Sequence, residues 1–349
     1  MTDDVLIRRA GAVGHISLNR PRALHALTQA MCEAICAALL EWRDDQDIEA
    51  LILDHAEGRG FCAGGDVTMV RRSALDDSGA VGRAFFHAEY RMNHLLFTYP
   101  KPVIAVMDGV TMGGGVGLAL PCRYRLATEN TLFAMPEGAI GLFPDVGAGW
   151  YLPRLPGRIG QFLALTGARL DGPECLWAGL ATHYLPSEHL PALKERLLEA
   201  PSDIDEAIRE LASSGPPPAR LMGNAERIAR LFASDTLDGV IAALSADPSE
   251  WAAKELKAVT AKCPTTAKVA LRQFAGTRDD FAAEMALEYR LACRMMMRPD
   301  FAEGVRAVLV DKDNAPNWQP ARPQDVTEVM LDAIFAPLPE GQEWTPFPA

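Results

Sequence analysis

The sequence predicts a layered α/β fold followed by a helical region. Over roughly the first 190 residues, short apolar segments typical of buried strands alternate with longer segments whose apolar residues recur at helical spacing. After Pro186 only helical patterns remain, and the proline-rich segment Ser213–Pro218 interrupts them. We therefore expect a core of residues 1–200, and a helical insert with C-terminal helices in residues 201–349.

The first expected elements are two strands and a helix. Val5–Arg8 and Val13–Asn19 are strand-like runs on either side of a glycine-containing turn. Leu24–Trp42 carries apolar residues at helical spacing, which predicts a helix. Ala50–Asp54 is a short apolar run, so a buried strand should follow that helix.

A glycine-rich loop, Glu57–Asp66, leads from this strand through a polar stretch to an expected helix near Val81–Phe97. Pro102–Met107 is the next expected strand, and Gly113–Leu120 should open a helix at a triple glycine. Two more short strands complete the alternating pattern: Tyr124–Ala127 and Thr131–Ala134.

Two glycine-rich loops could present free backbone N–H groups. Cys62-Ala-Gly-Gly65 and Gly113-Gly-Gly115 each follow an expected strand, and the second opens a helix. Two such donors can form an oxyanion hole, in which each typically lowers a barrier by ~3 to 4 kcal/mol. Either loop alone would be explained more simply as a turn. Neither matches GxGxxG or GxxxxGKS/T, so nothing supports a dinucleotide or nucleoside triphosphate site.

A pair of carboxylates, Glu137 and Asp145, follows these loops. Pro136, Gly141 and Pro144 are incompatible with one continuous helix, so the acids should lie on a turning loop that can direct both at one ligand. Two nearby carboxylates should separate their pKa values, although the sequence does not assign which one stays ionised. The glycine loops and the acid pair together indicate an enzyme.

These motifs resemble those of the crotonase superfamily, also called the enoyl-CoA hydratase/isomerase family. The resemblance covers most of the chain and includes Asn19–Leu27, Gly60–Asp66 and Lys101–Gly115. It implies an α/β crotonase (ClpP-like) spiral fold of ββα units, with C-terminal helices that cover an acyl site. It also implies an acyl-CoA thioester as substrate and, as oxyanion donors, the backbone N–H groups of Cys62 and Gly114.

The resemblance further implies roles for the acids. Glu137 would act on the thioester carbonyl carbon, as a general base for water or as a nucleophile that forms a mixed anhydride, and the sequence leaves both open. Asp145 would orient a substrate hydroxyl or assist proton transfer. Glu89 is assigned to substrate contact, although its spacing fits a solvated helix residue equally well. The other expected substrate contacts are Gly65, Asp66 and Gly113.

Within the superfamily the motifs fit best the 3-hydroxyisobutyryl-CoA hydrolase branch, thioesterases of valine breakdown. Hydratases carry a second glutamate, and dienoyl-CoA isomerases another acid, at the position of Gly117. We expect hydrolysis of a short 3-hydroxyacyl-CoA, with 3-hydroxyisobutyryl-CoA giving 3-hydroxyisobutyrate and CoA. The alternative is an enoyl-CoA hydratase or isomerase acting on an unsaturated acyl-CoA. A non-catalytic acyl-CoA-binding protein fits least, because the acid pair is intact.

Composition restricts the partners. The 349 residues carry a formal net charge of -12, which disfavours nucleic acid and anionic membranes. No apolar run reaches the roughly 18 to 20 residues of a membrane span, and Met1–Leu6 lacks signal-peptide features, so we expect a cytoplasmic protein. Seven scattered cysteines predict reduced thiols. A homo-oligomer is compatible with the resemblance.

No metal and no separate cofactor are expected, because CoA is part of the substrate. His87-Ala-Glu89 matches the HxE of zinc deaminases, but no PCxxC follows. Cys62 has no histidine close in sequence, so its thiol is not expected to act as a nucleophile. Basic residues that could contact the CoA phosphates, each explained more simply as a surface charge, are Arg22, Arg59 and Lys312.

Overall fold

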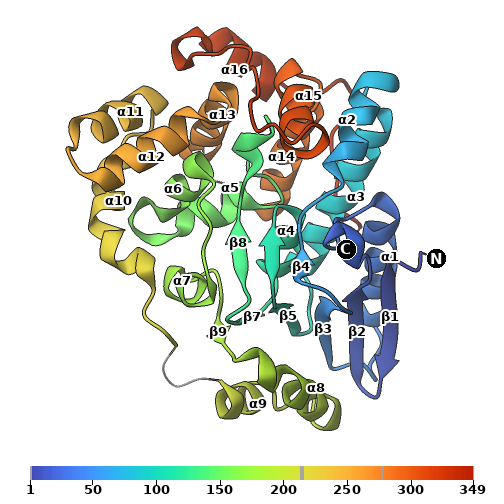
Figure 1. Cartoon of the computed structure of the whole chain (residues 1–349). Helices are drawn as coiled ribbons and strands as arrows, with labels where there is room; N and C mark the ends of the chain where they lie inside the picture. Colours follow the sequence, from blue (N-terminus) through green and yellow to red (C-terminus); the bar gives the residue numbers. More distant parts are fainter. Residues whose placement is uncertain (1, 213–215, 277, 349) are drawn as a thin grey trace.

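Two sheets of largely parallel strands form the α/β part of the chain (Figure 1). The computed structural model describes residues 2–212, 216–276 and 278–348. The larger sheet has the order β1-β2-β3-β5-β7-β9, in which β1 is antiparallel to β2 and the other neighbours are parallel. Its strands are β1 (Val5–Ala10), β2 (Val13–Leu18), β3 (Ala50–His55), β5 (Val103–Met107), β7 (Tyr124–Ala127) and β9 (His183–Tyr184).

The smaller sheet is entirely parallel and has the order β4-β6-β8. Strands alternate between the two sheets along the chain, because β3, β5 and β7 join the larger sheet and the next strand in each case joins the smaller one. This is the spiral of ββα units that the resemblance implied, and that prediction is confirmed. The strands of the smaller sheet are β4 (Gly60–Cys62), β6 (Val110–Met112) and β8 (Leu132–Ala134).

The first helix, α1 (Gln29–Arg43), begins later than the apolar spacing predicted. Leu24 and His25 have positive φ angles of 47° and 58°, so the chain turns there and cannot be helical. Thr28 then caps α1 by accepting a hydrogen bond from the N–H of Met31. The other helices of this half are α2 (Val67–Asp76), α3 (Ala80–Phe97), α4 (Gly114–Ala119), α5 (Ala148–Tyr151), α6 (Ile159–Thr166) and α7 (Gly172–Ala178).

Helices α8 (Leu190–Glu199) and α9 (Ile204–Leu211) cover one face of the larger sheet, with apolar side chains of both helices buried against residues of β2, β3 and β5. The boundary predicted at residue 200 falls between these two helices, which pack against each other. In the predicted break at Ser213–Pro218, residues 213–215 lie outside the described ranges and residues 216–218 have no regular structure.

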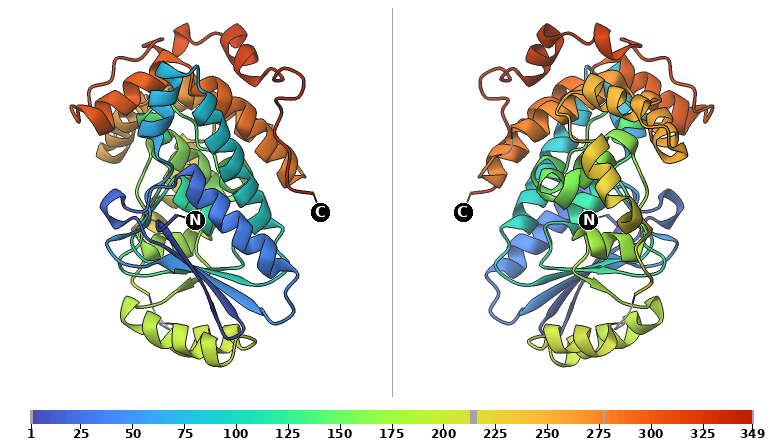
Figure 2. Two further views of the ribbon diagram at one scale, coloured as in Figure 1. Left: turned by 90° about the vertical axis from the view of Figure 1, so that its right-hand side faces the viewer. Right: turned by 90° about the vertical axis from the view of Figure 1, so that its left-hand side faces the viewer.

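The helical C-terminal region predicted from the sequence is confirmed. The two views of Figure 2 place its last helices at one end of the molecule and α8 and α9 at the opposite end, with the sheets between them. Its helices are α10 (Ala225–Leu231), α11 (Leu237–Ala246), α12 (Glu250–Thr260), α13 (Pro264–Ala275), α14 (Phe281–Met295), α15 (Pro299–Val305) and α16 (Glu328–Phe335), and a π-helical turn, Arg306–Val310, follows α15.

Helix α3 links the two halves of the molecule. One side of α3 packs against α1 and another against α14. The end of the chain also lies against α3, because Arg91 Nε donates to the carbonyl of Thr345 at 2.8 Å and the Trp344 indole N–H donates to the carbonyl of His87 at 3.3 Å. The C-terminal residues therefore hold a helix that belongs to the α/β half.

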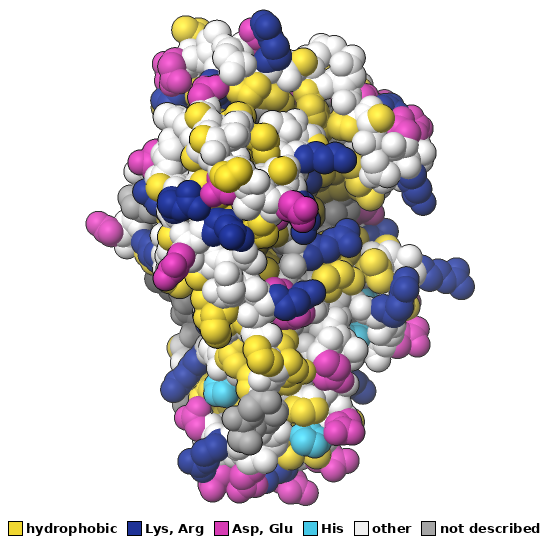
Figure 3. Space-filling view, turned by 60° about the vertical axis from the view of Figure 1, so that its left-hand side comes forward, with side chains coloured by type: hydrophobic (Ala, Val, Ile, Leu, Met, Phe, Trp, Pro, Cys, Tyr) yellow, Lys and Arg dark blue, Asp and Glu magenta, His cyan; other side chains and the backbone are white. Residues whose placement is uncertain are grey.

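The surface carries charges of both signs. On the face shown in Figure 3, basic and acidic side chains are interspersed among apolar ones. Within the described ranges, no helix combines the length and apolarity needed to cross a bilayer.

The two glycine loops touch at their backbones. A Cβ atom added at Gly115 would overlap the carbonyl oxygen and carbonyl carbon of Cys62, so α4 can approach β4 this closely only with glycine at this position. Gly113 has φ 48° and ψ -118°, a conformation that side chains disfavour. The triple glycine is therefore required by close packing and by backbone geometry.

We expect Gly115→Ala to lower the free energy of unfolding by about 1 to 3 kcal/mol, because the overlap with Cys62 forces the β4 and α4 backbones apart. Urea unfolding would measure this loss. Gly223→Ala is the matched control, since a Cβ there meets no atom within 4 Å. Equal stabilities for the two variants would contradict the close-contact explanation.

Candidate active site

A cavity of about 420 Å³ lies between the two glycine loops, the loop that carries the acid pair, and the π-helical turn that follows α15. Its walls are largely apolar, and three carboxylate residues line it: Glu89, Glu137 and Asp145. All three are buried, with exposed fractions of 2%, 4% and 4%. The structure therefore brings together acids that lie 48 and 8 residues apart in the chain, as their positions show.

Glu137 opens a short 3-10 turn, Glu137–Ala139, that follows Pro136. Gly141 ends this turn with a φ of 72°, and its Cα packs so closely on the Asp300 backbone that a side chain would overlap it. The Glu137 carboxylate reaches the triple glycine, because a Cβ added at Gly113 would lie 3.1 Å from Oε1. Burial, and then the nearby charge of Asp145, raise the pKa of Glu137 well above its ordinary value.

Asp145 faces a tyrosine of α3. The hydroxyl of Tyr90 donates to Asp145 Oδ2 at 2.7 Å, and both residues are buried. Burial raises the pKa of Asp145 to about 6, and the hydrogen bond from Tyr90 opposes this rise because it favours the ionised carboxylate. Asp145 thus accepts a hydrogen bond from a buried side chain within the cavity wall.

Glu89 also projects into the cavity from α3. It lies against both glycine loops, since a Cβ added at Gly65 would be 3.8 Å from Oε1 and one at Gly114 would overlap it. The alternative reading of Glu89 as a solvated helix residue is therefore wrong. Burial, followed by the charges of Asp145 and Glu137, raises the pKa of Glu89 well above its ordinary value. Three adjacent buried carboxylates cannot all ionise readily, so the cluster holds protons near neutral pH.

The structure does not bring Cys62 to the cavity. Cys62 is fully buried in β4 with its carbonyl packed on Gly115, and its thiol donates to the carbonyl of His25 at 3.2 Å. Burial raises the pKa of that thiol to about 12. The cavity is lined instead by the residues that follow β4, including Gly65. Gly65 replaces Cys62 as the candidate first oxyanion donor.

Gly65 and Gly114 both have an available N–H group. In the described part of the chain, neither backbone N–H donates a hydrogen bond. Gly114 is the first residue of α4, where N–H groups have no partner within the helix. Gly113, predicted as a substrate contact, also lines the cavity.

Asp66 and the predicted basic residues lie elsewhere. Asp66 caps α2 by accepting a hydrogen bond from the N–H of Met69, and its carboxylate pairs with Arg20 at 3.0 Å. It follows Gly65 in the chain but does not line the cavity. The basic residue that lines the cavity is Arg169, which the sequence did not single out. The cavity is not lined by any of the three basic residues that the sequence suggested, Arg22, Arg59 and Lys312.

Among the described residues, no group of three or more His, Cys, Asp and Glu side chains is arranged to hold a metal ion.

Neighbouring side chains occupy the space around Gly117, the residue at which hydratases carry their second acid. A Cβ added at Gly117 would lie 2.5 Å from Val146 Cβ and 2.8 Å from the amide nitrogen of Asn93. That amide donates to the carbonyl of Gly117 at 3.0 Å. An acidic side chain at residue 117 therefore has no room, and the loop that carries Asp145 occupies its place.

Two residues that help to build the site escaped the sequence analysis. Tyr90 directly follows Glu89 in the sequence but had no predicted role, and its hydrogen bond to Asp145 spans 55 residues. Glu288 on α14 accepts hydrogen bonds from the N–H groups of Gly147 and Gly149, about 140 positions earlier in the chain. No local pattern indicates such long-range pairs, although a glutamate amid the apolar residues of α14 is a sign of a buried polar contact.

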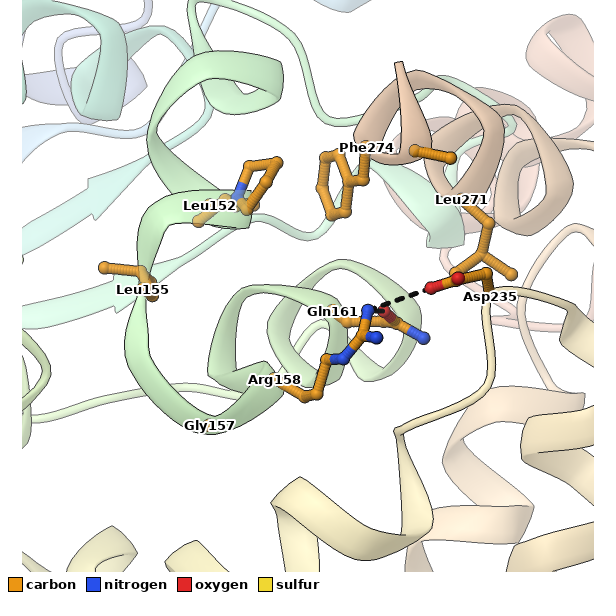
Figure 4. A pocket seen from close by; sticks show the side chains of 10 residues that line it. Leu152, Leu155, Gly157, Arg158, Gln161, Asp235, Leu271 and Phe274 are labelled. Carbon is orange, nitrogen blue, oxygen red and sulfur yellow. Dashed lines mark hydrogen bonds and ion pairs between the residues drawn. The ribbon is translucent and has the colours of Figure 1, made fainter. Parts of the chain in front are cut away.

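A second cavity, of about 460 Å³, lies near Arg158 and Asp235 (Figure 4). Its charged groups satisfy each other, because Arg158 Nη1 donates to Asp235 at 2.9 Å and to Gln161 at 3.1 Å. In the acid cavity, by contrast, Glu89 Oε1 and Glu137 Oε2 have no hydrogen-bond partner within the described residues. Unpaired buried oxygens are costly in a cavity without ligand, which favours the acid cavity as the reacting site.

Comparison with known proteins identifies a matching family and similar full-length relatives. The model of the enoyl-CoA hydratase/isomerase family matches residues 13–335. Mitochondrial 3-hydroxyisobutyryl-CoA hydrolases from Gallus gallus and Homo sapiens are each 41% identical, over 96% of this chain and 89% of theirs.

Solved structures give the same result for the fold. A carnitinyl-CoA dehydratase from Mycobacterium thermoresistibile is 36% identical, with a TM-score of 0.92 and 99% of both chains covered. An enoyl-CoA hydratase from Rhodobacter sphaeroides is 38% identical, with a TM-score of 0.91, covering 98% of this chain and 100% of that one.

The raised pKa of Asp145 predicts a pH-dependent effect of Asp145→Asn on stability. An acid with a raised folded-state pKa stabilises the fold below its ordinary pKa of 3.8, and this contribution is lost as the pH rises through about 6. We expect the variant to be more stable than the wild type by about 1 to 3 kcal/mol at pH 8, with the difference vanishing towards pH 4. Urea unfolding across this pH range would measure it.

Asp66→Asn is the control of opposite sign. Burial opposes ionisation of Asp66, but hydrogen bonds from Thr68, Arg20 and Met69 outweigh it and lower its pKa. This variant should therefore be less stable than the wild type at pH 8. Destabilisation of Asp145→Asn at pH 8 would contradict the inferred cost of ionising the acid cluster.

Proposed function

The chain belongs to the enoyl-CoA hydratase/isomerase family, the crotonase superfamily of acyl-CoA enzymes, and on this premise we propose that it hydrolyses a short 3-hydroxyacyl-CoA thioester. The favoured substrate is 3-hydroxyisobutyryl-CoA. The observation that carries the proposal is the pairing of Glu137 with Asp145 while Gly117 leaves no room for the second hydratase acid. The 41% identity to two 3-hydroxyisobutyryl-CoA hydrolases supports it.

The thioester carbonyl would be held by the two glycine loops. Gly65 and Gly114 line the cavity, and their N–H groups, which donate no hydrogen bond within the described residues, would donate to the oxygen on which negative charge develops. Each donor of this kind typically lowers the barrier by about 3 to 4 kcal/mol, since it is oriented before the reaction begins. The largely apolar walls of the cavity strengthen these hydrogen bonds by excluding water.

Glu137 would supply the attack on the carbonyl carbon. Its carboxylate lies beside Gly113, next to one of the two proposed donors. As a general base it would take a proton from water, whose oxygen bonds to the carbonyl carbon while the C–S bond breaks and the CoA thiolate leaves. As a nucleophile it would form an anhydride that water then cleaves, giving the same acid and thiol. Both routes need ionised Glu137, so the rate should rise with pH through its raised pKa.

The other two acids suit a hydroxylated acyl group. Glu89 and Asp145 are carboxylates buried in the cavity that holds Glu137, and Glu89 Oε1 has no partner within the described residues. A 3-hydroxyl group would supply the missing hydrogen bond, whereas a hydrocarbon chain would leave the oxygen unsatisfied. This arrangement selects for the hydroxyl more strongly than for the methyl branch of the acyl group.

A second candidate is hydration of an enoyl-CoA, or the reverse dehydration. It is supported by the two similar solved structures, which are described as an enoyl-CoA hydratase and a carnitinyl-CoA dehydratase. In this chain Asp145 would then have to do the work of the acid missing at Gly117.

We expect Glu137→Gln to reduce release of free thiol from 3-hydroxyisobutyryl-CoA by about 10²- to 10⁴-fold, because the base or nucleophile is lost. A colorimetric thiol assay would follow the release, with hydration of crotonyl-CoA measured in parallel. Glu255→Gln, at a buried glutamate on α12 that does not line the cavity, should retain wild-type activity. Hydration without thiol release would establish the second candidate instead.

Substrate comparison tests the role given to the hydroxyl. Isobutyryl-CoA, which lacks the 3-hydroxyl, should be cleaved at least about 10²-fold less efficiently than 3-hydroxyisobutyryl-CoA in kcat/KM. Glu89→Gln should narrow this difference, because an amide replaces the carboxyl group whose Oε1 lacks a partner within the described residues. Equal cleavage of the two substrates by the wild type would show that Glu89 and Asp145 do not bind the 3-hydroxyl group.

A further inference from the structure

We infer that Glu288 is a positioning residue for Asp145: the buried carboxylate on α14 holds the turn after Asp145 in the backbone conformation that directs this acid into the cavity. The inference rests on the proposed function only in that Asp145 belongs to the reacting site. Glu288 does not line the cavity, so its effect on the reaction would pass through the Asp145 loop.

The turn after Asp145 has an unfavourable backbone. Val146 has a φ of 54°, in the left-handed region that β-branched residues rarely adopt. The residue is 1% exposed, and its side chain packs against the Cα of Gly117. A conformation of this kind persists only where surrounding contacts impose it.

Glu288 supplies such contacts directly after Val146. Its Oε2 accepts from the N–H of Gly147 at 2.7 Å, and its Oε1 accepts from the N–H of Gly149 at 3.0 Å. One carboxylate therefore fixes two amides that flank the start of α5. Both hydrogen bonds are buried, and losing their acceptor would leave two amides unsatisfied away from water, so they can hold a strained turn.

A buried network fixes the Glu288 carboxylate in turn. The side-chain amide of Gln273 on α13 donates to both Glu288 Oε1 and Glu284 Oε1, each at 3.0 Å. Arg278 pairs with Glu284 Oε2 at 3.1 Å. Glu288 is fully buried and Gln273 fixes its orientation from the neighbouring helix α13, which is what positioning the loop requires.

Asp145 is thus held from two sides. Tyr90 donates to its carboxylate from α3, and Glu288 holds the backbone that follows it from α14. Without Glu288, Val146 would be free to relax to a negative φ, and this rotation would turn Asp145 away from Tyr90. Helices α3 and α14 pack against each other, so the two supports are connected.

The test is Glu288→Gln in a double-mutant cycle with Asp145→Asn. Glutamine keeps the shape of the side chain, but its NH2 group would face one backbone N–H and lose that bond. We expect kcat for thiol release to fall about tenfold or more while KM changes less than about threefold. In the Asp145→Asn background the same substitution should have no further effect, because Glu288 acts through Asp145.

Glu255→Gln is the control. It changes a buried glutamate on α12 that pairs with Lys254 and does not line the cavity. Its kcat should stay within about twofold of the wild type. If Glu288→Gln does not fold, Glu288→Asp takes its place in the cycle, because the shorter side chain keeps the carboxyl group and withdraws it from Gly147 and Gly149.

Wild-type kcat in the Glu288 variant, or a loss that multiplies with that of Asp145→Asn, would overturn the inference. Failure of the proposed function is separable from this result. If the wild type releases no thiol from 3-hydroxyacyl-CoA but hydrates crotonyl-CoA, the cycle is run on hydration, where the inference still predicts no further loss in the Asp145→Asn background.

Discussion

Burial of three carboxylates in one cavity is the constraint on which the rest of this structure depends. Glu89, Glu137 and Asp145 come from two separate stretches of chain, and desolvation opposes the ionisation of each one. The surroundings must therefore supply donors and close packing without filling the cavity. Tyr90 provides a donor for Asp145, and glycines leave the space into which Glu89 and Glu137 extend.

The glycine loops meet this constraint with three adjacent residues that serve different purposes. Gly113 adopts a backbone conformation suited to glycine, Gly114 leaves room for the Glu89 carboxylate, and Gly115 lets α4 rest on β4. The same segment provides a free N–H at the first residue of the helix. Under the proposed function, substrate binding and fold stability thus depend on the same three glycines.

The alternating pattern of strands and helices, the helical second half and the acid loop were predictable from sequence because they depend on local periodicity and on proline and glycine. Other features depend on three-dimensional contacts. The start of α1 was misplaced because Leu24 and His25 adopt left-handed conformations that apolar spacing does not signal. Cys62 was chosen in place of Gly65 because motif spacing does not reveal which part of the loop after β4 turns into the cavity. Glu288 was missed because its partners are about 140 residues away.

The contact between Val146 and Gly117 has a consequence for how members of such a family can diverge. An acid introduced at residue 117 would collide with Val146, whereas loss of the Val146 side chain alone would leave a gap beside Gly117. A smaller residue at 146 would also relieve the unfavourable φ of Val146, so this change is the easier one to make first. The two positions are therefore coupled: an acid at residue 117 requires space to be made at both Val146 and Asn93, and a one-acid site becomes a two-acid site only after the Asp145 loop has changed.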